Sequence, residues 1–251
     1  MRKNIFEILS EDFDIVKEIR AIWHLFIYAN VTYAHSDIYN GRVESDILGC
    51  VDKFSFHDWK SRNRFLSPYE MMMNFDINER KIVDINCFCV ELLDILEFFL
   101  NIIKRCDVAI ENYHVIVSND YYLLKGNINE FIEYFGYGVN YNEDSEQVII
   151  FEKNQAAVAV AEISESDTAK KILQYNNYKL KGDIESKKNI ILLLASQLEP
   201  QRNVLENINK SLVSDLFFML NNMNLRHNNI ESKDKNFKKI VGEMGNEELE
   251  E

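Results

Sequence analysis

The sequence predicts a mostly helical α+β fold, a helical bundle with a small inserted antiparallel β-sheet. Gly and Pro number only 8 and 2, about a third of their usual share, so few residues serve the tight turns of an all-β protein. Apolar residues recur every three or four positions in the first and last parts of the chain, as they do in amphipathic helices. Between residues 113 and 163 the pattern changes to short β-branched and aromatic runs, which favour strands.

Four helices are predicted in the first part of the chain. One runs from Ser10 to about Ala34, and a second covers roughly Val43 to Trp59. A third begins at Ser67-Pro68-Tyr69-Glu70, because a Ser followed by Pro, with Glu three positions later, is a capping box. The fourth, from Ile82 to Cys106, is apolar around most of its circumference, so we expect it to be the central helix of the core.

Four short runs predict the strands of the sheet: His114 to Val117, Tyr121 to Leu124, Val148 to Phe151 and Ala157 to Ala161. β-Branched and aromatic residues of this kind fit a pleated, half-buried surface. The last two runs are separated by a polar loop of hairpin length. A short helix is expected between the second and third runs, over Asn129 to Tyr134, ended by Gly136 and Gly138.

The helical pattern returns after Asp167, with one helix to about Tyr178 and another from Asp183 to Leu198. A last stripe of apolar residues runs from Val204 to Met223 and stops at Arg226. These patterns divide the chain into four parts. They are a first part of the bundle (1–110), the sheet insert (111–165), a second, HEPN-like part of the bundle (166–230, the resemblance being given below) and a polar acidic tail (231–251).

The net charge of −13 repels phosphate, so binding to duplex DNA would need a local basic patch that the average hides. No apolar run reaches the ~20 residues that cross a bilayer, and acidic residues near the N-terminus interrupt any export signal. We therefore expect a cytoplasmic protein without a membrane partner. The four cysteines lie in apolar, helix-like surroundings, which predicts reduced thiols in the core.

No phosphate loop, dinucleotide fingerprint, paired-His zinc motif or serine-hydrolase elbow occurs in the sequence. Cys87 and Cys89 are two positions apart, which on a helix separates them by about 200° and makes a shared metal awkward. The sequence therefore predicts neither a cofactor nor a metal site, and it leaves open whether the protein is an enzyme.

One stretch does suggest chemistry. The last apolar stripe runs into polar residues, with Arg226 and His227 at the junction and Asn222, Asn228 and Asn229 around them. A guanidinium, an imidazole and amides at one helix end can hold a phosphate or a developing oxyanion. Alternatively, Arg226 pairs with an acidic neighbour while His227 and the Asn side chains satisfy the last carbonyls of the helix.

The stretch resembles the end of the last long helix in HEPN domains, the helical bundles of many toxin and abortive-infection RNases of bacterial phage defence. Their signature is Arg, then Asn, Asp or His, then a His several residues later. Arg226 matches the first position and His227 the second, whereas residues 231–233 have no His where the closing one belongs. The resemblance implies a homodimer that cleaves RNA without a metal, or a degenerate form that only binds RNA.

In that chemistry Arg226 would stabilise the phosphorane charge, and His227 of the two copies would have to serve as acid and base. A basic patch at the entrance of the cleft would help an acidic protein to bind RNA. Such a patch could form from Lys233, Lys235, Lys238 and Lys239.

Tyrosines gather in or beside the predicted sheet, with Tyr121 and Tyr122 as candidate binding residues; the others are Tyr113, Tyr134, Tyr137 and Tyr141. Tyr-rich surfaces suit recognition of another protein. The alternative function is therefore a non-enzymatic sensor or scaffold that binds a partner through this sheet. More often, such a cluster reflects packing of the sheet on the helical body.

Overall fold

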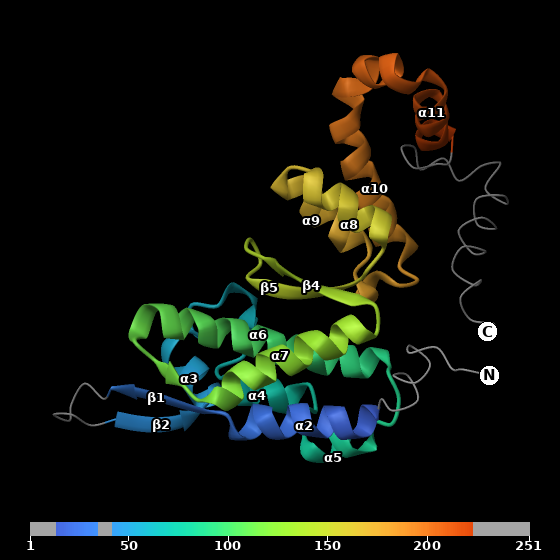
Figure 1. Ribbon diagram of the computed structural model, residues 1–251. Coiled ribbons are helices and arrows are strands. Elements are labelled where there is room, and N and C mark those ends of the chain that lie inside the picture. Colours follow the sequence, from blue (N-terminus) through green and yellow to red (C-terminus); the bar gives the residue numbers. More distant parts are fainter. Residues whose placement is uncertain (1–13, 35–41, 223–251) are drawn as a thin grey trace. The chain divides into compact units, whose positions relative to one another are not determined.

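The computed structural model of the chain describes residues 14–34 and 42–222 (Figure 1). The fold is α+β and mostly α, as predicted, with long helices and small antiparallel sheets. The chain forms two compact units, residues 1–152 and residues 153–251, and each is described here by itself. In the part of the chain that is described, no helix is long and apolar enough to cross a membrane.

The first unit contains the helices α2 (Ile15–Tyr28), α3 (Ile47–Phe54), η1 (Lys60–Arg62), α4 (Pro68–Asn74), α5 (Glu79–Asp84), α6 (Val90–Tyr113) and α7 (Asn119–Tyr134). Its strands are β1 (Asn30–Ala34), β2 (Arg42–Asp46), β3 (Ile116–Val117), β4 (Tyr137–Asn142) and β5 (Gln147–Glu152). β2, β1 and β3 form one antiparallel sheet in that order, and β4 pairs with β5 in a hairpin.

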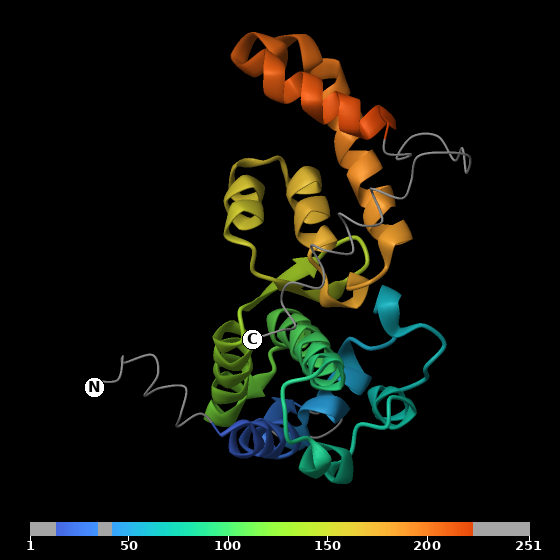
Figure 2. The same cartoon turned by 90° about the vertical axis from the view of Figure 1, so that its right-hand side faces the viewer.

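The predicted central helix is confirmed in part as α6, which is buried on several sides by Leu92, Phe99, Ile102 and Cys106 among others. It begins at Val90 and runs on to Tyr113, whereas Ile82 to Asp84 belong to α5 and residues 85–89 separate the two helices. α3, α7 and β5 pack against α6, and α2 packs against α7 and α5 (Figure 2). Aromatic rings join these layers, since Phe26 of α2 stacks on Phe99 with 4.0 Å between ring centroids. This core positions every polar contact of the first unit described below.

The predicted capping box at the start of α4 is confirmed in its first half. The Ser67 hydroxyl accepts the amide hydrogen of Glu70 at 3.1 Å, with Pro68 in the first turn. The Glu70 carboxylate accepts from the amide of Leu66 at 2.7 Å, one residue before the cap, rather than from Ser67. Asp14, Asp46, Asn78, Asn154 and Asp183 cap other helices in the same way.

The predicted strands are only partly correct. β5 confirms Val148 to Phe151, and β3 falls within the run His114 to Val117. The run Tyr121 to Leu124 was assigned wrongly, because it lies in α7, where Tyr121, Leu124 and Ile128 recur at helical spacing and bury one face. The run Ala157 to Ala161 was also assigned wrongly. It lies in α8, where the strong helix preference of Ala outweighs its alternation with Val.

Two predicted helices are shorter than expected, because strands replace part of each. β1 occupies the end of the first predicted helix, and β2 occupies the start of the second. β4 was not predicted either. Its Gly138 lies against the Phe151 ring so closely that a Cβ would stand 2.6 Å from it, so the residue that reads as a helix stop instead lets the two strands of the hairpin pack.

The second unit consists of helices α8 (Gln155–Ile163), α9 (Ser166–Tyr175), η2 (Tyr178–Leu180), α10 (Ile184–Leu198), η3 (Glu199–Gln201) and α11 (Arg202–Asn222). Consecutive helices pack in pairs, α8 on α9, α9 on α10 and α10 on α11. Ala195, Val213, Phe217 and Leu220 form a buried cluster between α10 and α11. α11 is kinked at Asn209, whose side chain accepts the amide hydrogen of Leu212 at 3.0 Å and so restarts the helix.

The division between the units differs from the one predicted. It lies after β5, at residues 152 and 153, and not at 110 and 165. The segment 111–165 is not one sheet, since α7 and the β4–β5 hairpin belong to the first unit and α8 to the second. The helices after residue 166 therefore belong to a compact unit of their own and not to a bundle shared with the first helices.

Candidate functional site

Most of the site predicted from the sequence falls on residues that the structure does not describe. Arg226, His227, Asn228 and Asn229 lie outside the described residues. Asn222 is the last residue of α11, and its side chain is likewise outside the description. Of the predicted site residues, Tyr121 and Tyr122 are therefore the two whose side chains the structure places.

Tyr121 and Tyr122 lie at the start of α7, not on a sheet. The Tyr121 ring is 1% exposed, and its hydroxyl lies 2.9 Å from the Ile103 carbonyl oxygen and 2.8 Å from the Asp107 carboxylate. Burial, with the negative charge of Asp107 nearby, raises the pKa of Tyr121, so this hydroxyl stays protonated. Tyr121 is thus a core residue, whereas Tyr122 is exposed. The predicted Tyr-rich sheet does not exist in that form.

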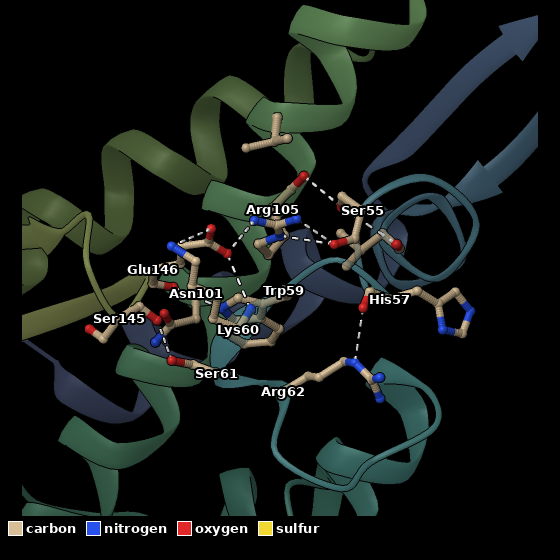
Figure 3. A network of polar contacts seen from close by, with 12 residues as sticks. Ser55, His57, Trp59, Lys60, Ser61, Arg62, Asn101, Arg105, Ser145 and Glu146 are labelled. Atoms are coloured by element: carbon tan, nitrogen blue, oxygen red, sulfur yellow. Dashed lines mark hydrogen bonds and ion pairs between the residues drawn. The ribbon is translucent and has the colours of Figure 1, made fainter.

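A polar network surrounds Arg105 of α6, which is 5% exposed (Figure 3). Its guanidinium donates from Nε to the Ser55 carbonyl at 3.1 Å and also from Nη2 to the same oxygen. The Ser55 hydroxyl in turn donates to the Arg105 carbonyl at 2.9 Å. These reciprocal bonds hold the end of α3 against the middle of α6.

Glu146, in the turn between β4 and β5, is the acidic partner of Arg105, and their side chains are 3.2 Å apart. The same carboxylate oxygen accepts the Lys60 amide hydrogen at 3.2 Å. The Lys60 ammonium lies 3.6 Å from the other oxygen. The Glu146 main-chain oxygen accepts from the Trp59 indole at 2.7 Å, and Ser61 donates to the Ser145 carbonyl beside it. Glu146 itself has a positive φ of 53°.

This network fastens the β4–β5 turn and the segment after α3 onto α6. Asn101, one turn before Arg105, adds a further tie, because its side-chain oxygen accepts the amide hydrogen of Val148 in β5 at 2.8 Å. Both carboxylate oxygens of Glu146 are already engaged with cations or an amide, and the His57 imidazole points away from the network (Figure 3). The arrangement is better suited to holding these elements together than to transferring a proton.

A second buried cluster lies on the next residues of α6. Cys50 of α3 and Cys106 of α6 are both fully buried, and each affects the pKa of the other. The Cys106 side chain lowers the pKa of Cys50, whereas the Cys50 side chain together with burial raises the pKa of Cys106. Cys106 also contributes to the raised pKa of Tyr121. The next residue, Asp107, forms an ion pair with Lys125, with 2.6 Å between carboxylate and ammonium.

The described residues contain no group of three or more His, Cys, Asp or Glu side chains placed as metal ligands would be. Cys87 is exposed and Cys89 is half-buried, and both stand just before α6.

Positive charge gathers in the second unit. Residues 170–188 contain six lysines and two acidic residues, a local net charge of +4 in a chain of −13. The lysines come from three parts of the unit that contact one another, α9, the segment around η2, and α10; they are Lys170, Lys171, Lys179, Lys181, Lys187 and Lys188.

α9 and α10 run antiparallel where these lysines lie. Near one end of the pair the Thr168 hydroxyl is hydrogen-bonded to the Gln197 side chain at 2.9 Å. Near the other end the Lys187 ammonium lies 5.0 Å from the centre of the Tyr175 ring. Residues 170–188 thus bring several lysines and the Tyr175 ring into one part of the second unit.

Sequence reasoning did not find the Arg105 network, the buried Cys50 and Cys106, or the lysines of residues 170–188. The lysines of residues 170–188 are visible in the sequence as a local excess of charge, which the average over the chain conceals. Arg105 gives little local signal, because it directly follows Lys104 in a helix that also carries several acidic residues. The pairing of Cys50 with Cys106 gives no local signal, because the two residues are 56 positions apart. No family model matches the chain, and comparisons with curated proteins and with solved structures found no match.

Proposed function

We propose that the second unit of the chain, residues 153–251, is an RNA-binding, HEPN-like module of a bacterial defence or toxin system. The observation that carries this proposal is the concentration of six lysines over residues 170–188 in a strongly acidic protein. Clustered ammonium groups attract a phosphate backbone and release its counterions. In this proposal the six lysines supply the local basic patch that the overall charge conceals.

The aromatic ring among the lysines favours RNA over duplex DNA. Unpaired bases stack on exposed Tyr rings, while ammonium groups contact the neighbouring phosphates. Tyr175 is half-buried, with Lys187 over its ring. A base could stack there once Lys187 turns toward a phosphate. We therefore expect single-stranded RNA to bind better than a duplex.

The helical hairpin of α10 and α11 is consistent with the HEPN resemblance, in which the catalytic residues follow the last long helix. α11 ends at Asn222, four residues before Arg226 in the sequence. In the proposed module the lysines hold RNA, Arg226 stabilises the phosphorane and His227 transfers the proton. Because the closing His of the motif is absent, cleavage is the weaker half of the proposal and binding the stronger.

RNA binding is tested by fluorescence anisotropy with a short unstructured RNA at several KCl concentrations. The triple variant Lys171→Glu/Lys187→Glu/Lys188→Glu should bind at least tenfold more weakly. The slope of log affinity against log salt should become shallower by about 2, since each lost contact to a single strand contributes roughly 0.7. Lys210→Glu is the matched control, because Lys210 is an exposed lysine of the same unit outside residues 170–188.

Cleavage is tested with the same RNA and the variants Arg226→Ala and His227→Ala. RNA decay that either variant abolishes supports the nuclease. Binding without decay leaves an RNA-binding module without catalytic activity. If the wild-type chain binds no RNA at low salt, or if Lys210→Glu weakens binding as much as the triple variant does, the proposal is wrong.

A second candidate function, a non-enzymatic interaction module, is favoured by exposed apolar side chains on α11. Ile208 is 79% exposed and Val204 and Leu212 are each 64% exposed, more than a helix facing water alone usually shows. Lys210 and Asp215 lie beside them with opposite charges. Lys210 and Asp215 both lie in the part of α11 after the kink at Asn209 and offer opposite charges for an antiparallel contact between two copies. We therefore name a second copy of this chain as the partner.

This candidate predicts a dimer by light scattering after size exclusion, which Ile208→Asp/Leu212→Asp should convert to monomer. Ser214→Asp adds the same charge at an exposed polar position of α11 and should leave the dimer intact. A wild-type monomer at high protein concentration would disprove self-association through α11.

A further inference from the structure

Residues 243–251 contain five glutamates and no cationic residue, a net charge of −5. We call this stretch the acidic segment. It lies outside the described residues, so its chemistry is known from its sequence alone. Carboxylates concentrated in this way repel one another and are stabilised by any group of cations that the chain can bring to them.

The charges of the described residues select one place for such a contact. Residues 1–152 contain 14 cationic and 26 acidic residues, so the first unit as a whole repels the acidic segment. In the second unit, residues 153–169 and 189–222 together contain three cationic and six acidic residues. Of the three stretches that make up the described part of this unit, residues 170–188 alone carry a positive net charge, +4.

Three lysines of that stretch lie close together where α9 meets α10. Lys171 and Tyr175 are one turn apart on α9 and therefore share a face of that helix. The Lys187 ammonium of α10 lies 5.0 Å from the centre of the Tyr175 ring, and Lys188 follows it in the sequence. We call Lys171, Lys187 and Lys188 the lysine group. All three residues are half-buried, so each keeps some exposed surface.

The chain is long enough to bring the acidic segment to the lysine group. From Lys188 to Asn222, the last described residue, α10 and α11 span at most roughly 50 Å, because a helix rises by about 1.5 Å per residue. Residues 223–242, which join α11 to the acidic segment, can span up to about 65 Å. Groups on one chain meet at an effective concentration on the order of 1 mM, so several weak ion pairs are enough for a contact.

We propose that the acidic segment docks on the lysine group and competes with RNA for it. This inference rests on the proposed function, because it assigns a regulator to the same lysines. Glutamate carboxylates accept charge-assisted hydrogen bonds from ammonium groups as phosphate oxygens do. A run of glutamates lacks the bases that stack on a Tyr ring, so an RNA that makes enough contacts displaces the segment. The segment thus raises the affinity that an RNA needs in order to bind.

Docking is tested first without RNA, by treating the full chain at low salt with a water-soluble carbodiimide. This reagent joins a carboxylate to an ammonium group that it contacts. Peptide mapping should find glutamates of the acidic segment joined to the lysine group, and about 1 M KCl should remove these crosslinks, because it shortens the screening length to about 3 Å. Mixing in an isotope-labelled chain shows that the joined peptides come from one molecule.

Lys210 is the matched control for crosslinking, because it is exposed and lies nearer to the acidic segment in the sequence than the lysine group does. It should be joined to the segment far less often than Lys187. Equal yields at Lys210 and Lys187 overturn the proposal. Crosslinks confined to the lysines of residues 233–239, the sequence neighbours of the segment, overturn it as well.

Acetylation of amines measures the same contact without a carbodiimide. In the variant Glu247→Gln/Glu248→Gln/Glu250→Gln, the lysine group should be acetylated at least threefold faster than in the wild-type chain, because the docked segment no longer covers it. Lys210 should react at the same rate in both chains. Equal rates for the lysine group in the two chains contradict docking.

Competition is tested with the same variant in the RNA anisotropy experiment. At low salt this variant should bind RNA at least threefold more tightly than the wild-type chain. Glu162→Gln/Glu165→Gln/Glu199→Gln is the matched control, since it removes the same charge from exposed glutamates of the same unit. The control should leave RNA affinity nearly unchanged. An equal gain for both variants would make the effect one of net charge and overturn competition by the segment.

The outcomes separate this inference from the proposed function. RNA binding that the substitutions in the acidic segment leave unchanged overturns the inference and keeps the proposed function. Crosslinks to the lysine group in a chain that binds no RNA, with or without those substitutions, overturn the proposed function and leave the docking of the segment in place.

Discussion

Arg105 is buried with its guanidinium between a main-chain carbonyl and the Glu146 carboxylate, and this pairing determines the cost of removing either partner. Glu146→Ala leaves a buried cation without its counter-charge, so we expect the free energy of unfolding to fall by about 3 kcal/mol. Urea unfolding followed by Trp fluorescence measures the change. Trp59 contacts Glu146 directly and provides the signal.

Glu143→Ala is the control for this substitution, because Glu143 lies in the same turn and is exposed. It should change the free energy of unfolding by less than about 0.5 kcal/mol. Equal losses for the two variants would show that the turn itself, and not the buried ion pair, is the source of stability.

Asp183 shows how protonation of a single helix cap affects stability. Hydrogen bonds from Ser186 lower its pKa below the ordinary value of 3.8. Since the folded-state pKa is depressed, the stabilising contribution is present above the unfolded pKa and is lost as pH falls through the lower folded value. The amide of Ser186 should therefore exchange its hydrogen faster at pH 3 than at pH 6, after correction for intrinsic rates.

Asp183→Asn supplies the comparison, since Asn remains a good cap but does not titrate. The acid-dependent part of Ser186 exchange, measured by NMR, should disappear in this variant. An unchanged pH profile would assign the effect to another carboxylate.

At this scale local sequence identified the Ser67 cap but not the buried pairs, and Asp167, which was expected to cap a helix, lies in the first turn of α9 after Glu165. Ser67 and Asp183 act on residues three positions away, so their function can be recognised from local sequence. Arg105 meets Ser55 and Glu146, which are 50 and 41 positions away. Such partners depend on how whole elements pack, which one sequence does not show.

At the scale of elements, Asn101 ties the main chain of β5 to α6, in addition to the apolar packing between them. Asn101 donates to the Glu97 carbonyl at 2.8 Å and accepts from the Val148 amide at 2.8 Å. Asn101→Leu leaves the Val148 N–H buried without an acceptor, which should cost about 1–3 kcal/mol. Stability is measured by urea unfolding, and NMR hydrogen exchange should show faster exchange of the Val148 amide.

Asn112, on the same helix, is a matched control. It makes the same bond to the carbonyl four residues earlier, to Val108 at 2.9 Å, but it is exposed. Asn112→Leu should therefore have little effect on stability or on Val148 exchange. A loss as large as that of Asn101→Leu would attribute the cost to the helix and not to the tie with β5.

The errors in predicting elements have a common cause. Runs such as Tyr121 to Leu124 and Ala157 to Ala161 are short and apolar, and their period does not distinguish a strand from a helix. α6 was predicted correctly because its apolar pattern extends over several turns. β4 was missed because its two neighbouring glycines suggested the end of a helix, although Gly138 is in fact needed beside Phe151.

At the scale of the molecule, the two compact units predict separate folding. A fragment of residues 1–152 retains α6 with every element packed on it. Its NMR spectrum should overlay on the corresponding signals of the full chain, and the same holds for residues 153–251. A fragment of residues 1–142 lacks β5 and Glu146, and it should give the poorly dispersed spectrum of an unfolded chain.

Collapse of the 1–152 fragment would show that the two units depend on each other to fold. Sequence reasoning did not find the division because helical patterns on both sides of the sheet region look alike. Apolar periodicity shows that a helix has a buried face, but not which neighbour covers it.

The left-handed backbone at Glu146 limits the order in which this sequence can diverge. A φ of 53° is a conformation that Gly adopts at little cost and most other residues adopt reluctantly, so neutral drift at position 146 should tend toward Gly. That exchange is harmful while Arg105 is present and becomes acceptable after Arg105 has changed to an uncharged residue. Lineages descended from this chain should therefore lose the arginine first and the glutamate second.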